Sequence, residues 1–123
     1  MRAGLLLLMT LCPGIPADVD PVVQDMHDAA QEWRGRYGLF GQVLDADLCD
    51  LAQQHAEWMA ATGRYDHGSW DQVIHRGPVT ARGAVSGWIR SGPHAAWLLG
   101  GNRRAGWGHA VGLGGHYWVG VFR

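Results

Sequence analysis

The stretch AGWGHAVGLGGHYWVGVF, residues 105–122, decides the fold of this chain. Its two halves, 105–111 and 116–122, alternate or run apolar and aromatic, and Gly112-Leu113-Gly114-Gly115 joins them. Two strand-like segments joined by a short glycine-rich turn are typical of a β-hairpin. We therefore predict a C-terminal β-hairpin, in which these glycines form a turn and not a phosphate-binding loop.

The chain before this hairpin has a helical pattern. Apolar side chains recur at helical spacing over residues 21–37, 48–59 and 80–91. Asp45 or Asp47 can cap the second of these helices. Because helices come first and antiparallel strands come last, the pattern predicts an α+β layered domain.

The connections between these elements are less regular. Gly63 is expected to end the second helix. Apolar residues follow neither helical nor strand periodicity over residues 69–79, so no element is predicted there. Pro93 is expected to end the third helix, and a short helical turn is expected at 95–99.

The charge of the chain is nearly balanced. Ten positively charged residues, all of them Arg, stand against eleven Asp and Glu, for a formal net charge of -1. Nucleic acid or an anionic membrane surface would call for a strongly basic footprint, so no nucleic-acid partner is expected. With 123 residues, 47% of them hydrophobic, the composition predicts one globular domain.

The first residues have the layout of a secretory signal peptide. Arg2 precedes an apolar run from Gly4 to Cys12, and a segment with two prolines follows and ends at Ala17. The run is too short to span a bilayer. We predict a signal peptide at 1–17, a domain at 18–123, a secreted or periplasmic location, and no membrane span in the mature chain.

Two other interpretations of this segment stay open. A lipoprotein acylated at Cys12 would normally carry a small residue where Leu11 stands. The segment could also be a buried first helix. If Cys12 leaves with a signal peptide, Cys49 remains alone and no intrachain disulfide is expected.

Histidines are the main candidates for chemistry, because no serine-nucleophile or nucleotide-binding motif is present. The chain has seven, and packing or exposure explains most of them. His67 and His94 differ, because each follows a predicted helix end in a loop where functional side chains tend to sit. The two could share a divalent ion such as Zn²⁺, although a stable zinc site normally needs three or four protein ligands. Asp66 and Asp71 flank His67, and either could orient its imidazole.

Several motifs occur together in a fixed order and carry a family resemblance. They are Met26-His27-Asp28, Leu48-x-x-x-Ala52-x-x-His55-Ala56-x-x-Met59-Ala60, His67, Trp88-Ile89-Arg90-Ser91-Gly92-Pro93-His94, Gly106-Trp107-Gly108-His109-Ala110 and Tyr117-Trp118-Val119-Gly120-Val121-Phe122. On these motifs the chain resembles, from about Val22 to the C-terminus, the CAP superfamily of cysteine-rich secretory, antigen 5 and pathogenesis-related-1 (SCP) domains. The short bacterial members of the superfamily are the most similar.

The resemblance implies an α-β-α sandwich, with a central antiparallel sheet between helical layers, and an exported protein. It also implies a cleft that is lined by two His and, in many members, two acidic residues, and that can hold a divalent metal. His67 and His94 match the two His. Gln72 stands at the first acidic position, and Ser91 stands at the second.

A neutral amide at the acidic position changes the expected chemistry. An amide is a poor ligand for a hard cation and cannot serve as a general base near pH 7. Shifting the alignment by one residue would bring Asp71 into this position, but it breaks the register with Ile74 and Gly77. The expected ligand-binding cleft therefore comprises His67, Gln72, Ser91 and His94, with Asp71 as a stand-in and the two His as metal-ligand candidates.

Two functions remain open. The first, which we favour because the site has lost an acid, is an exported module that binds a small molecule, lipid or peptide and has no obligatory cofactor. The second is a metal-assisted hydrolase of peptides or cell-wall material, in which His67 and His94 hold Zn²⁺ and an acidic side chain activates water. A purely structural role, in which water bridges the two His, is a third interpretation. Trp70, beside the histidine loop, is either a cleft wall or part of a sugar-stacking platform.

Overall fold

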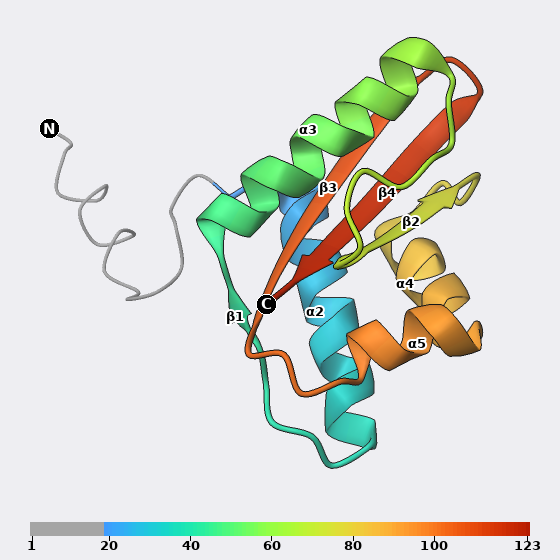
Figure 1. The fold of residues 1–123 in the computed structure, drawn as a ribbon. Coiled ribbons are helices and arrows are strands. Elements are labelled where there is room, and N and C mark those ends of the chain that lie inside the picture. Colours follow the sequence, from blue (N-terminus) through green and yellow to red (C-terminus); the bar gives the residue numbers. More distant parts are fainter. Residues whose placement is uncertain (1–18) are drawn as a thin grey trace, which may run out of the picture.

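The structure is a computed structural model and describes residues 19–123. The predicted signal peptide at 1–17 and Cys12 lie outside this range. Along the described chain the elements are α2 (Pro21–Arg36), β1 (Val43–Leu44), α3 (Ala46–Thr62), β2 (Gln72–Arg76), α4 (Ala81–Ile89), α5 (Gly92–Leu98), β3 (Arg104–Gly112) and β4 (Gly115–Phe122). Figure 1 shows α3 lying along one face of the sheet, while α2 and α4 lie on the other. This arrangement confirms the predicted α-β-α sandwich.

The sheet has the strand order β1-β3-β4-β2. β3 and β4 pair antiparallel from Ala105 opposite Phe122 to Gly112 opposite Gly115, which confirms the C-terminal hairpin. β2 also pairs antiparallel with β4. The two-residue β1 pairs in parallel with β3, so the sheet is mixed at this edge and antiparallel elsewhere.

β2 lies within residues 69–79, where the sequence shows no period and no element is predicted. Its first three residues, Gln72, Val73 and Ile74, are all buried, so side chains on both faces are covered. Alternation of polar and apolar residues is therefore lost, and the strand depends on its pairing with β4. The residues of such a strand show no local sequence pattern from which the strand could be predicted.

Helix α3 lies against the sheet through glycines of β3. A Cβ atom added at Gly106, Gly108 or Gly112 would clash with the backbone of α3. The facing positions of the helix are also small, because Ala52 and Ala56 are fully buried there. Small residues on both sides bring the two backbones unusually close together.

Three tryptophans fill the opposite face of the sheet. Trp88, Trp107 and Trp118 are each at most 1% exposed and belong to one core with α2 and α4. Each indole N–H is satisfied: Trp88 donates to the Ile74 carbonyl, Trp107 to His27 Nδ1 and Trp118 to the Pro78 carbonyl. The large rings thus bury their area without leaving a polar group unpaired.

Helices α2 and α3 occupy the ranges expected from the sequence, and Asp45 caps α3 by accepting the Leu48 N–H. The expectation for Pro93 is wrong. α4 already ends at Ile89, and Pro93 lies in the first turn of α5, where a missing N–H costs nothing. His94 is therefore a helical residue and not part of a loop.

The contact between α3 and β3 can be tested by substitution. In Gly108→Ala the new Cβ would lie about 2.5 Å from the carbonyl carbon of Ala52, a backbone atom that cannot rotate away. We expect the free energy of unfolding to fall by about 1–3 kcal/mol or more, measured by urea denaturation.

Gly35→Ala is the matched control, because its Cβ would meet nothing within 4 Å on α2. It should be neutral or raise the free energy of unfolding by up to about 1 kcal/mol through helix propensity. Equal effects of the two substitutions would contradict the close-contact explanation.

Candidate functional site

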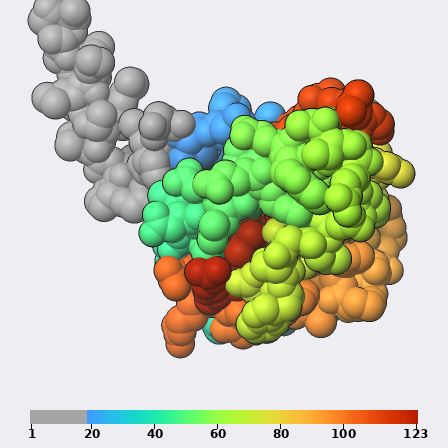
Figure 2. All heavy atoms as spheres, turned by 45° about the horizontal axis from the view of Figure 1, so that its top comes forward, coloured from blue at the N-terminus to red at the C-terminus, as the bar shows by residue number. Residues whose placement is uncertain are grey.

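The loop between α3 and β2 carries His67. Gly63 ends α3 in the left-handed conformation, with φ 73°, and the chain then turns back toward the sheet edge. His67 lies exposed in this loop. Figure 2 shows the loop, in yellow-green, at the surface beside the dark red end of β4.

Gln72 secures this loop to the sheet. It is the first residue of β2 and is 5% exposed, and its Oε1 accepts the Gly68 N–H at 2.8 Å. This bond determines which end of the amide is oxygen, because a backbone N–H needs an acceptor. The amide nitrogen makes no hydrogen bond within residues 19–123 and is not sealed from solvent.

His94 reaches the site from the first turn of α5. Its Nδ1 lies 2.9 Å from Oγ of Ser91, which precedes the helix as its N-cap residue. The pKa of His94 is lowered, first by burial and then by repulsion from His67 and His75. His94 is therefore neutral near pH 7, with Nδ1 held by Ser91.

These side chains meet at an open cleft between the loop and α5. The cleft has a volume of about 470 Å³, and its lining residues are His67, Gly68, Ser69, Trp70, Gln72, Pro93, His94 and Trp97. Of the five residues expected from the sequence, it brings together His67, Gln72 and His94. Ser91 lies behind His94, where it lines a smaller hollow of about 170 Å³.

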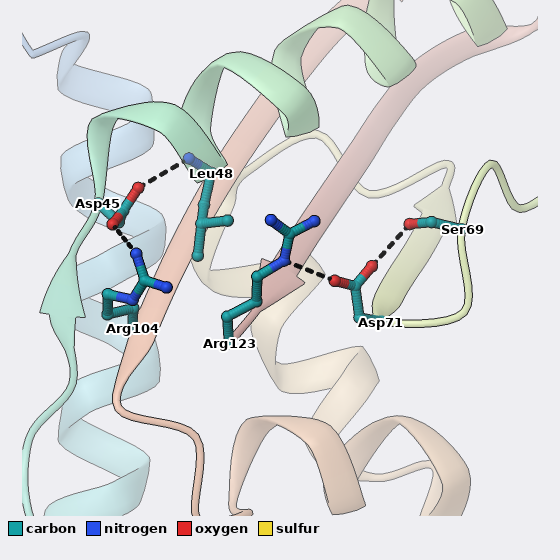
Figure 3. A network of polar contacts seen from close by, with 6 residues as sticks. All are labelled: Asp45, Leu48, Ser69, Asp71, Arg104 and Arg123. Carbon is teal, nitrogen blue, oxygen red and sulfur yellow. Dashed lines mark hydrogen bonds and ion pairs between the residues drawn. The ribbon is translucent and has the colours of Figure 1, made fainter.

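Asp71 is not among the residues that line the cleft. Its carboxylate accepts the Ser69 hydroxyl at 2.7 Å and pairs with Nε of Arg123 at 3.0 Å, as Figure 3 shows. Burial alone raises the pKa of this carboxyl, but the bonds from Ser69 and Arg123 outweigh it, so the net pKa is lowered. The expectation that Asp71 stands in as the acid of the cleft is therefore not met by this geometry.

Three residues at or beside the site lie outside the predicted set. Trp70, at 82% exposed, and Trp97 line the cleft with their ring centroids 5.4 Å apart. His75 lines the small hollow together with Ser91 and His94. The position of Trp70 beside His67 is the only sequence signal that points to any of them.

The donor set of the cleft does not fit a tightly held zinc ion. Zn²⁺ normally takes three or four protein ligands, and the cleft offers two imidazoles and one amide whose oxygen is already bonded. No group of three His, Cys, Asp or Glu side chains able to hold a metal exists in the described part of the chain.

The model of the cysteine-rich secretory protein family, CAP, matches residues 27–122. The chain belongs to the CAP family. It is similar to an extracellular SCP-domain protein from Bacillus anthracis, with 20% identity, a TM-score of 0.70, and coverage of 82% of this chain and 40% of that one. An outer surface protein from Borrelia burgdorferi also has a TM-score of 0.70, with 16% identity and coverage of 85% of this chain and 94% of that one.

These bacterial relatives are extracellular or surface proteins, and at such identities they share the fold alone with this chain. The chain spans 40% of the length of the Bacillus protein. Hookworm platelet inhibitor is a further structural relative, with 12% identity, a TM-score of 0.66, and coverage of 93% of this chain and 75% of that one. A search of curated protein sequences finds no match. From residue 19 onward, none of the helices of this CAP domain combines the length and apolarity needed to cross a bilayer.

The electrostatics of the cleft predict how His94 titrates. We expect its imidazole to titrate below the ordinary histidine pKa of about 6.5, because burial disfavours the charged form. Removing the imidazole of His67, which disfavours a charge on His94, in His67→Ala should raise the pKa of His94. Proton NMR of the imidazole ring hydrogens between pH 4 and 9 measures both values. A pKa of His94 at or above 6.5 in the unsubstituted domain would contradict this assignment.

Proposed function

We propose that this chain is an exported CAP domain that binds a ligand in the cleft of His67, Gln72 and His94 and does not cleave it. The observation that carries the proposal is the position of the acidic side chains. Gln72 occupies the place of the expected acid, and its amide oxygen is bonded to the Gly68 N–H. The nearest carboxylate in sequence, that of Asp71, is engaged by Ser69 and Arg123.

Hydrolysis would need a group that removes a proton from water. An amide cannot do this, and the Asp71 carboxylate, whose pKa is lowered by the bonds from Ser69 and Arg123 against the effect of burial, is a weak base. The neutral imidazole of His94 could accept a proton, but no carboxylate from residues 19–123 orients it, and Ser91 holds its Nδ1. The groups present are better suited to hydrogen bonding than to proton transfer.

Export is part of the proposal and rests on two supports. The layout of residues 1–17 is that of a signal peptide, so the mature chain would begin at Asp18. The similar bacterial structures are extracellular or surface proteins. Mass spectrometry of the protein recovered outside the cytoplasm would give the first residue, and an acylated Cys12 would identify a lipoprotein instead.

Zinc binding distinguishes this proposal from the metal-assisted hydrolase. The chain from Asp18 onward contains every element of the described fold, and we expect it to show no stoichiometric Zn²⁺ binding in calorimetry near pH 7.5. Gln72→Glu keeps an oxygen for the Gly68 N–H and adds a carboxylate, so it should strengthen Zn²⁺ binding about tenfold or more.

The control for this experiment is His67→Ala/His94→Ala in the Gln72→Glu background, which should abolish the gain. Stoichiometric Zn²⁺ binding by the unsubstituted chain that disappears in the same double variant would overturn the proposal and favour the hydrolase. A double variant that only lowers the melting temperature would indicate the structural role for the two His.

Binding without turnover is the second expected outcome. A panel of peptides, lipid vesicles and cell-wall fragments is added to the chain, and the His67 and His94 ring resonances are followed by NMR. At least one class should shift these resonances, while mass spectrometry shows no cleaved product. Cleavage that depends on His67 and His94, or the absence of any shift across the panel, would count against a binding module.

A further inference from the structure

The walls of the cleft carry no acidic or basic side chain apart from its two histidines. None of the residues that line it is Asp, Glu, Lys or Arg. Asp71, next to Gln72 in the chain, forms an ion pair with Arg123 at 3.0 Å, and Asp66, next to His67, forms one with Arg64 at 3.4 Å. A phosphate, a fatty-acid carboxylate or a peptide terminus would need a fixed charge to replace its hydration, and the cleft offers none.

A tryptophan stands exposed at the mouth of the cleft and is nevertheless anchored. Trp70 is 82% exposed, and its ring lies 5.4 Å from that of Trp97. Trp97 stacks in turn on Phe122 at 6.1 Å, and Phe122 is 1% exposed in the core. This row of rings, Trp70-Trp97-Phe122, connects the exposed indole to the sheet, so Trp70 presents a large apolar face to solvent at a defined place.

Gln72 adds a side chain with hydrogen-bond donors to the lining of the cleft. Gln72 is 5% exposed, and its amide nitrogen makes no hydrogen bond within the described residues. Because the oxygen of this amide accepts from Gly68, its two N–H groups are the side-chain donors that Gln72 can offer to a ligand, and Gln72 lines both this cleft and the neighbouring pocket beside α3. A buried donor of this kind loses free energy if a purely apolar ligand displaces its water.

We propose that the ligand of this cleft is an uncharged saccharide; this inference rests on the proposed binding function and names its ligand class. A pyranose ring has an apolar C–H face that packs on an indole and a rim of hydroxyl or acetamido groups that accept from N–H donors. Trp70 supplies the first partner and the amide of Gln72 supplies the second, while a ring nitrogen of His94 donates to or accepts from the same hydroxyl groups. The volume of about 470 Å³ lies within the range of small-molecule sites, about 300–1,000 Å³.

A lipid fits the same cleft less well. An acyl chain would gain most from an enclosed and dry lining, whereas this cleft is open and has a polar amide in its floor. The exposed Trp70 would cover only one side of such a chain. The combination of one flat aromatic face with neutral donors is complementary to a sugar.

The experiment is a titration of the chain from Asp18 onward with two neutral probes, chitotetraose and cellotetraose, followed by tryptophan fluorescence and calorimetry. We expect saturable binding of at least one probe. Trp70→Ala should weaken it about tenfold or more, because the apolar face is lost, and this exposed residue can be replaced without disturbing the core.

Two further variants separate recognition from folding. Gln72→Glu keeps the acceptor for Gly68 but removes both N–H donors and adds a charge, so it should also weaken saccharide binding about tenfold or more. Tyr37→Ala is the matched control, because Tyr37 is an aromatic residue 59% exposed at the end of α2 and does not line the cleft. It should leave binding unchanged.

No binding of either probe up to about 10 mM, or binding that Trp70→Ala leaves unchanged, would overturn the saccharide assignment. In that event, His67 and His94 resonances that shift with peptides or vesicles would leave the binding module in place with another ligand class. Cleavage of a probe would instead contradict the proposed function, even if Trp70 is required for binding.

Discussion

The close approach of α3 to β3 is the constraint on which the rest of this structure depends. Gly106, Gly108 and Gly112 present no side chain to the helix, and a Cβ atom at any of them would overlap its backbone. Since α3 is held against the strand along its length, its last turn meets the hairpin, where the Leu113 N–H donates to the Ala60 carbonyl. The chain must then return to the sheet edge through the loop that carries His67. The packing of α3 on one face of the sheet thus determines where the loop that forms one wall of the cleft begins.

The second wall of the cleft, which α5 forms, depends on the opposite face of the sheet. Arg34, fully buried in α2, donates from Nε to the Phe40 carbonyl and from Nη1 to the Leu98 and Gly100 carbonyls. These bonds hold the C-terminal end of α5 against α2 and thereby position the helix that carries His94 and Trp97. A buried guanidinium needs such acceptors, because its charge is otherwise expensive to remove from water. The two sides of the cleft therefore rest on separate layers of the sandwich and contact each other through Trp70 and Trp97.

The pairing of charges around the cleft determines what chemistry it supports. Asp71 is one residue away from Gln72, yet its carboxylate turns to Arg123 at the end of β4. This leaves an amide, two imidazoles and two tryptophans in the cleft, and the proposed ligand binding rests on this set. Membership in the CAP family accounts for the sandwich, and a shared fold by itself transfers no activity to this chain.

Local features of the sequence were enough to predict α2, α3 and the C-terminal hairpin, because helical spacing, an Asp cap and a glycine turn all act between residues close in the chain. The resemblance to CAP domains then placed His67, Gln72 and His94 at one site. Only the tertiary structure decided that β2 forms, that Pro93 begins a helix, that Asp71 faces Arg123 and that Trp70 stands exposed over the cleft. Each of these depends on partners far away in sequence, such as β4 for β2 and Trp97 for Trp70, and the direction of a side chain follows from such partners rather than from its neighbours along the chain.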